Sequence, residues 1–242
     1  MNILAIGNSF SSDATRYLHQ IAREAGVTLS VASLYIGGCS LERHYRNMLS
    51  DSHDYVLVYN GMSTGFHVSI KEALLNREWD VVTVQQQSGR SPKADTYHPY
   101  MEQLCAYVRK CQPKAKLVVH QTWAYEQGSE MLLSAGYADH RDMFADLQRA
   151  YAQAAETVHA DGIIPSGQLF QNMLAAGFES VQRDTYHASL GAGRYALGLL
   201  WYRMLTGNSV LDNAFCDFDE PVSRTEVEII KGLVEEFTAL MV

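Results

Sequence analysis

Residues 2–26 read NILAIGNSFSSDATRYLHQIAREAG, and this stretch decides the fold class. Its first part, residues 2–6, is a short apolar run of the kind that forms a buried strand. A glycine-containing turn at residues 7–9 interrupts the run, and a helical pattern follows over about residues 13–25, with Gly26 placed to end it. The stretch therefore predicts a strand, a tight turn and a helix.

The same alternation of strands and helices continues along the chain and favours a parallel sheet that is covered on both faces. We therefore predict an α/β fold, a three-layer sandwich with a flavodoxin-like parallel sheet of about five strands and helices on both faces, in a single domain over residues 1–242. The five strands are expected near residues 2–6, 27–35, 79–85, 116–121 and 162–164, while residues 52–66 are ambiguous and 55–59 resemble one arm of a hairpin.

Composition and charge argue against several classes of partner. The net charge of -8 and the lack of a Lys/Arg cluster disfavour nucleic acid. No apolar run approaches the ~20 residues that span a bilayer, so we expect no membrane partner. No basic leader precedes the first apolar run, which predicts a cytoplasmic protein if Met1 is the natural start and an exported one if a leader was removed.

The chain has no motif for a cofactor or a metal ion. Neither GxGxxG nor GxxxxGK[ST] occurs, so no nucleotide cofactor is expected. The four cysteines show no CxxC spacing and no histidines at zinc-like intervals, so no metal is expected and reduced thiols are the simpler interpretation.

Ser9 is the first candidate for chemistry because it lies where the first strand turns into a helix. Backbone N–H groups converge at a helix N-terminus, and this arrangement suits a developing oxyanion. The alternative is that Ser9, Ser11 or Ser12 only caps the helix.

Asp184 and His187 form the second candidate. A serine nucleophile needs an imidazole as its base and a carboxylate to hold that imidazole, and a spacing of three residues lets both groups face the same way. The alternative is that Asp184 caps a helix beginning near Ser189 while His187 lies on the surface.

Three blocks of the chain, in this order, resemble those of the SGNH (GDSL-like) hydrolases. Residues 7–11 (GNSFS) are similar to the first block, 35–40 (YIGGCS) to the second and 184–187 (DTYH) to the last. The resemblance covers nearly the whole chain. It implies a serine esterase with Ser9 as nucleophile, His187 as base and Asp184 as its partner. It also implies an oxyanion hole that includes the N–H groups of Ser9 and Gly38.

The third block departs from the family pattern. Where the family has GxND, this chain has VQQQSG at residues 84–89. A glutamine amide can donate the same hydrogen bond as the asparagine. Strand alternation would place Gln85 and Gln87 on one side, so we expect one of these two to complete the oxyanion hole.

The substrate is less constrained by the sequence than the reaction. We expect an O-acetyl ester of a small molecule or a carbohydrate, with Trp123 and Tyr125 as a wall on which a sugar stacks, or else as ordinary loop packing. A lipase or thioesterase acting on acyl chains is one alternative. A catalytically silent carbohydrate-binding protein on the same fold is another. The sequence gives no oligomeric state.

Overall fold

The structure is a computed structural model, and it describes residues 1–239. Its centre is a seven-stranded sheet in the order β4-β3-β2-β1-β5-β6-β7. The strands are β1 (Asn2–Gly7), β2 (Ser30–Tyr35), β3 (Tyr55–Tyr59), β4 (Met62–Val68), β5 (Val81–Val84), β6 (Lys116–Gln121) and β7 (Gly162–Pro165).

The five predicted strands form the parallel part of this sheet, β2-β1-β5-β6-β7. The predicted number was too low for the whole sheet, because β3 and β4 extend it as an antiparallel hairpin beside β2. The hairpin turns at Asn60 and Gly61, both with positive φ, as a tight hairpin requires. β4 is mostly exposed at the sheet edge, so it lacks the apolar run that identifies the central strands.

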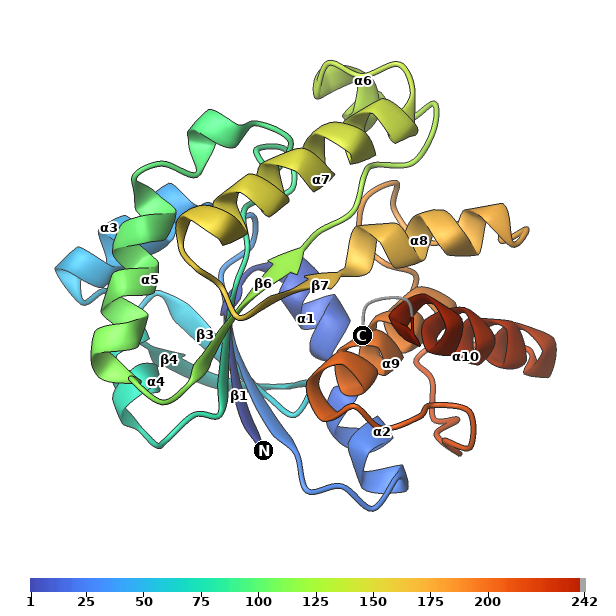
Figure 1. Cartoon of the computed structure of the whole chain (residues 1–242), viewed down its shortest axis with the longest axis horizontal. Coiled ribbons are helices and arrows are strands. Elements are labelled where there is room, and N and C mark those ends of the chain that lie inside the picture. The colour runs from blue at the N-terminus through green and yellow to red at the C-terminus, as the bar shows by residue number, and fades with distance from the viewer. Residues whose placement is uncertain (240–242) are drawn as a thin grey trace.

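Helices cover both faces of the sheet in two groups (Figure 1). One face carries α3 (Leu41–Ser50), α4 (Ile70–Leu75), α5 (Tyr100–Cys111) and α7 (His140–Thr157), with a short 3-10 helix at Ala94–Thr96 and α6 (Glu130–Ser134) beyond them. The other carries α1 (Ser9–Thr15), α2 (Leu18–Glu24), α8 (Ser166–Ala175), α9 (Ala192–Thr206) and α10 (Arg224–Ala239).

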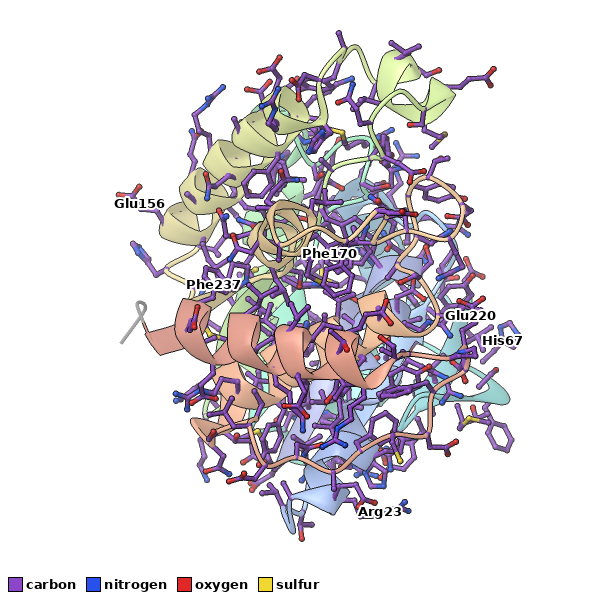
Figure 2. The ribbon with its side chains drawn as sticks, turned by 90° about the vertical axis from the view of Figure 1, so that its right-hand side faces the viewer. Arg23, His67, Glu156, Phe170, Glu220 and Phe237 are labelled. Carbon is purple, nitrogen blue, oxygen red and sulfur yellow. The ribbon has the colours of Figure 1, made fainter. Side chains whose placement is uncertain are left out.

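In the second group of helices, α9 lies at the centre. It is buried on nearly all sides because α1, α2, α8 and α10 pack against it. Figure 2 shows α10 lying across the outside of this layer. Its Glu235 accepts a hydrogen bond from the Val210 N–H at 3.0 Å, which anchors the helix to the segment that leads into it. No helix within residues 1–239 has both the length and the apolar content to cross a bilayer.

The topology determines where a ligand can reach the sheet. The chain runs from β1 outward to β2, then returns to place β5 on the other side of β1. Open α/β sheets bind ligands beyond the carboxyl ends of the strands at such a reversal, which here means the ends of β1 and β5. Ser9 and Gln85 follow directly after these two strands.

Candidate active site

Ser9 is the first residue of α1, at the carboxyl end of β1. Asn8 is extended, and its side chain caps the helix by accepting a hydrogen bond from the Phe10 N–H at 3.0 Å. Gly7 leaves no room for a side chain, since a Cβ there would lie 2.1 Å from Ser11 Oγ. The tight turn and the cap together place the Ser9 hydroxyl at the helix N-terminus.

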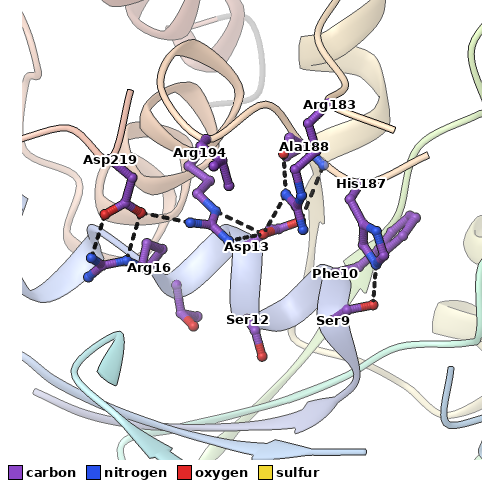
Figure 3. A network of polar contacts seen from close by, with 12 residues as sticks. Ser9, Phe10, Ser12, Asp13, Arg16, Arg183, His187, Ala188, Arg194 and Asp219 are labelled. Carbon is purple, nitrogen blue, oxygen red and sulfur yellow. Dashed lines mark hydrogen bonds and ion pairs between the residues drawn. The ribbon is translucent and has the colours of Figure 1, made fainter. Parts of the chain in front are cut away.

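The structure brings Ser9, His187 and Asp184 together, and Figure 3 shows the Ser9 and His187 side chains pointing toward each other. His187 Nε2 lies 2.8 Å from Ser9 Oγ, and His187 Nδ1 lies 2.8 Å from Asp184 Oδ2. An ionised carboxylate can only accept, so Nδ1 carries the proton and Nε2 is free to accept the hydroxyl proton of Ser9. This is the tautomer that a histidine base requires.

The turn from Asp184 to His187 is held in an unusual backbone conformation. Thr185 has φ +72°, a region that β-branched residues rarely adopt. The Glu126 N–H donates to Thr185 O at 2.8 Å, and the His187 N–H donates to Asp184 Oδ1 at 2.8 Å. These bonds keep the two side chains on the same side of the turn.

The carboxyl of Asp184 is held in its charged form. Burial opposes ionisation, but hydrogen bonds from the side chain and the backbone N–H of His187 outweigh it, so the pKa of Asp184 is lowered. The site therefore keeps a negative charge beside the imidazole, where it stabilises an imidazolium.

The His187 ring packs against aromatic side chains. The His187 ring lies 4.0 Å from the Tyr186 ring and 5.7 Å from the Phe10 ring, measured between centroids. Trp123 stacks on Phe10 at 4.2 Å and donates from Nε1 to Tyr186 O at 2.7 Å. This stack limits the positions that the imidazole can take.

The expected sugar wall of Trp123 and Tyr125 needs correction. Trp123 is 0% exposed and Tyr125 is 3% exposed, and the Tyr125 hydroxyl lies 2.9 Å from Ser88 Oγ. Neither ring presents a face on which a sugar could stack. Both side chains are ordinary packing, and Tyr186 is the aromatic residue beside His187 that stays partly exposed.

The backbone N–H groups of Ser9 and Gly38 are both free to donate, as the donors of an oxyanion hole must be. Neither the Ser9 N–H nor the Gly38 N–H has an acceptor among residues 1–239. Asn8 Nδ2 donates to Cys39 O at 3.1 Å, which ties the turn after β2 to the turn after β1. Asn8 is a site residue that the sequence analysis did not single out, although an Asn before a helix is a known capping signal.

The glutamines of the third block have different environments. Gln85 is 1% exposed; its Nε2 donates to Asn8 Oδ1 at 2.7 Å, and its Oε1 faces Ser11 and His120. Gln86 is also buried, with its amide bonded to Thr96 and Leu41.

Among these three glutamines, Gln87 is the one whose amide nitrogen has no acceptor within residues 1–239, and its side chain is partly exposed. The pairing of Gln85 with Gln87 by strand alternation was wrong because β5 ends at Val84, so the alternation does not extend to these residues. Gln87 is therefore the glutamine that can donate to a ligand.

Ser9 and His187 are both partly exposed, so solvent reaches the site. None of five well-formed cavities over residues 1–239 is lined by Ser9 or His187. The largest, about 770 Å³, lies beside β3, β4 and α4. No group of three or more His, Cys, Asp or Glu side chains in the described part of the chain is arranged to hold a metal ion.

Comparison with known proteins identifies the family of this chain. Residues 2–235 match the family described as a domain of unknown function, DUF4886. The chain belongs to the DUF4886 family. The crystal structure of a DUF4886 family protein from Bacteroides uniformis superimposes with a TM-score of 0.90 at 31% identity, covering 99% of this chain and 95% of that one. None of the curated proteins matches.

The DUF4886 chain also shares its fold with SGNH hydrolases, which confirms the fold implied by the resemblance of the three sequence blocks. A candidate SGNH hydrolase from Slackia heliotrinireducens has a TM-score of 0.60 at 23% identity, covering 85% of this chain and 98% of that one. An acetylxylan esterase from Geobacillus stearothermophilus has a TM-score of 0.56 at 14% identity, covering 85% and 94%. At these identities the likeness is one of fold.

Proposed function

We propose that this protein is a serine ester hydrolase in which Ser9 is the nucleophile, His187 the general base and Asp184 the carboxylate that holds His187. The observation that carries the proposal is the continuous line of contacts, with 2.8 Å from Ser9 Oγ to His187 Nε2 and 2.8 Å from His187 Nδ1 to Asp184 Oδ2. Ser9 and His187 are both partly exposed, which leaves room for a substrate.

The reaction follows from this arrangement. Ser9 Oγ attacks the ester carbonyl carbon while His187 Nε2 takes the hydroxyl proton. The tetrahedral intermediate collapses, and His187 returns the proton to the departing alcohol. Water, deprotonated by His187, then attacks the acyl-Ser9 carbonyl, which releases the carboxylic acid and regenerates the Ser9 hydroxyl.

The oxyanion is bound by three donors in this proposal. The free N–H groups of Ser9 and Gly38 supply two of them, and the free amide of Gln87 supplies the third. Such donors act on the charge that develops in the transition state, and each is worth about 3 kcal/mol.

The preferred substrate is a short-chain ester, an O-acetyl group on a carbohydrate. A long acyl chain needs an enclosed apolar cavity, and Ser9 lines none of the five cavities described above, so we favour a small acyl group. The fold shared with an acetylxylan esterase supports the same class of substrate. With Trp123 and Tyr125 buried, Tyr186 is the aromatic side chain proposed to contact the alcohol part.

The first test is hydrolysis of p-nitrophenyl acetate by wild type, Ser9→Ala, His187→Ala and the matched control Ser12→Ala. Ser12 lies three residues further along α1, and its hydroxyl points away from His187 (Figure 3). Turnover that Ser9→Ala and His187→Ala abolish and Ser12→Ala retains would support the proposal. Turnover that persists in Ser9→Ala would refute the mechanism.

The acyl group is tested separately with p-nitrophenyl acetate, butyrate and octanoate, and with acetylated xylo-oligosaccharides. We expect kcat/KM to fall as the acyl chain lengthens. A preference for octanoate would overturn the acetyl assignment while leaving the role of Ser9 intact.

A further inference from the structure

Asp13 is a buried carboxylate that the proposed mechanism does not use. Its side chain is 2% exposed and accepts hydrogen bonds from Arg183 Nη1 at 3.1 Å on both oxygens and from Arg194 Nε at 2.8 Å. It also accepts from the Ala188 N–H at 3.2 Å. Figure 3 shows Asp13 between the two arginines, beside the His187 loop.

The position of Asp13 connects the two parts of the proposed triad. It lies four residues after Ser9 on α1, so the two side chains fall on the same face of the helix. Ala188, which Asp13 binds, directly follows His187. One helix of seven residues therefore carries the nucleophile and also holds the loop that carries the base.

Asp13 also controls a cation beside the triad. Arg183 Nε lies 4.0 Å from Asp184 Oδ2, the oxygen that accepts from His187 Nδ1. Its Nη1 is turned instead to Asp13 and to the Ala188 carbonyl. Without the charge of Asp13, Arg183 would compete with His187 for Asp184.

The surrounding charges alternate in sign. Asp219 pairs with Arg194 at 2.7 Å and with Arg16 at 2.6 Å, at the end of the row that lies away from the triad. The full row is Asp184, Arg183, Asp13, Arg194, Asp219 and Arg16, three carboxylates and three guanidinium groups.

We propose that Asp13 is a positioning residue for the general base: it fixes the His187 loop on the helix that carries Ser9 and holds Arg183 away from Asp184. This inference rests on the proposed esterase function for its catalytic meaning. The contacts of Asp13 with Arg183 and Ala188 carry it, and its effect on His187 can be measured without any substrate.

Substitution of Asp13 and substitution of Arg183 should shift the titration midpoint of His187 in opposite directions. Asp13→Asn leaves Arg183 uncompensated near His187, which disfavours the imidazolium and moves the titration midpoint of His187 to lower pH. Arg183→Gln removes a cation and moves the midpoint to higher pH. Since Asp13 is buried, these interactions are weakly screened, and shifts of about half a pH unit or more are expected. The charged and titratable groups on the His187 loop and on the segments bonded to it are Asp184, Arg183 and Tyr186 on the loop itself, Asp13 on α1 with its partner Arg194 on α9, and Glu126 before α6, whose backbone N–H binds Thr185.

The experiment is an NMR titration of the histidine side chains in the full chain, with the His187 signal assigned by its loss in His187→Asn. Asp219→Asn is the matched control, because Asp219 also holds two arginines and touches no residue of the 183–188 loop. Opposite shifts in Asp13→Asn and Arg183→Gln, with no shift in Asp219→Asn, are expected.

Shifts in the same direction, or no shift, would show that Asp13 has only a structural role. An Asp219→Asn shift equal to that of Asp13→Asn would mean that the effect comes from the whole row of charges, and this would overturn the specific role of Asp13. If Asp13→Asn does not fold, Arg183→Gln alone decides: an upward shift supports the proposal, and its absence overturns it.

Kinetics separate this inference from the proposed function. With p-nitrophenyl acetate, Asp13→Asn is expected to lower kcat about tenfold or more at nearly constant KM, while Asp219→Asn stays within about twofold. Absence of turnover in wild type together with opposite titration shifts would reject the esterase function and keep the effect of Asp13 on His187.

Discussion

The molecule contains two serine–histidine pairs of nearly the same geometry. His187 Nε2 lies 2.8 Å from Ser9 Oγ, and His120 Nε2 lies 3.0 Å from Ser166 Oγ. Each histidine uses Nδ1 to donate to a side-chain oxygen, on Asp184 in the first pair and on Gln85 at 3.0 Å in the second. Both imidazoles therefore have the same tautomer.

The pairs differ in access to solvent and in the charge of the third group. His120 and Ser166 are both 0% exposed, and burial lowers the pKa of His120 to about 3, so it stays neutral. The amide of Gln85 carries no charge with which to stabilise an imidazolium. We therefore expect catalysis only from the Ser9–His187 pair, which has both a carboxylate partner and access to solvent.

The largest expected effect separates the two serines. Ser9→Ala should lower kcat for p-nitrophenyl acetate by about 10⁴-fold or more, because it removes the nucleophile. Ser166→Ala should retain activity within about threefold and lower the free energy of unfolding by about 1–3 kcal/mol, since it leaves a buried imidazole nitrogen without its partner. Comparable loss of activity in both variants would contradict the assignment of the nucleophile.

Asp184→Asn gives the open pair the amide partner that the buried pair has. The asparagine does not stabilise the imidazolium and can favour the wrong tautomer, so kcat should fall by about 10³- to 10⁴-fold with KM little changed. Steady-state kinetics on a variant that keeps the wild-type circular dichroism spectrum checks this. Near-wild-type turnover would mean that Asp184 is dispensable.

Gln87→Glu tests the third oxyanion donor with little change of shape. Loss of the amide donor should lower kcat by about 10²-fold with a smaller change in KM, because the hydrogen bond strengthens only in the transition state. Gln103→Glu, on the surface of α5, serves as the control for added charge. Equal activities of the two variants would remove Gln87 from the oxyanion hole.

The smallest expected effect is on the pH dependence of the free energy of unfolding, and it arises from the buried histidines. The pKa of His44, like that of His120, is lowered by burial to about 3, below the value of about 6.5 in an unfolded chain. Between these values the unfolded state binds protons that the folded state does not, so stability is full above pH ~6.5 and falls as the pH drops toward 3.

From pH 7 to pH 5 each buried histidine should reduce the free energy of unfolding by about 2 kcal/mol. Urea unfolding of His120→Gln should show a flatter pH dependence over this range than wild type. His67→Gln, at an exposed position of β4, is the matched control. An unchanged slope in His120→Gln would contradict the neutral, buried state of His120.

The contrast between local and long-range structure explains what the sequence could predict. Ser9 and the pair of Asp184 and His187 were found because each depends on a few consecutive residues, a turn with a helix start or a spacing of three. The parallel strands were found because both of their faces are buried, which leaves continuous apolar runs such as 81–84.

Features set by distant segments were missed or misassigned. The depth of Trp123 depends on Phe10, more than a hundred residues away, and composition around residue 123 does not distinguish a stacked core ring from an exposed one. The choice among three consecutive glutamines depends on Asn8, which holds Gln85 in the interior. Asp13 belongs to no sequence motif, and the role proposed for it depends on its contacts with Arg183 and Ala188, which come from distant parts of the chain.

Asp184 and His187 lie three residues apart on one turn, while Ser9 stands at the other end of the chain. The proposed base and its carboxylate therefore depend on the conformation of a single turn. A single insertion between residues 183 and 188 would displace both groups at once and leave the turn that carries Ser9 unchanged. If the proposed function is right, a change confined to this one loop would convert the hydrolase into a protein that keeps its fold and its nucleophile but has no base.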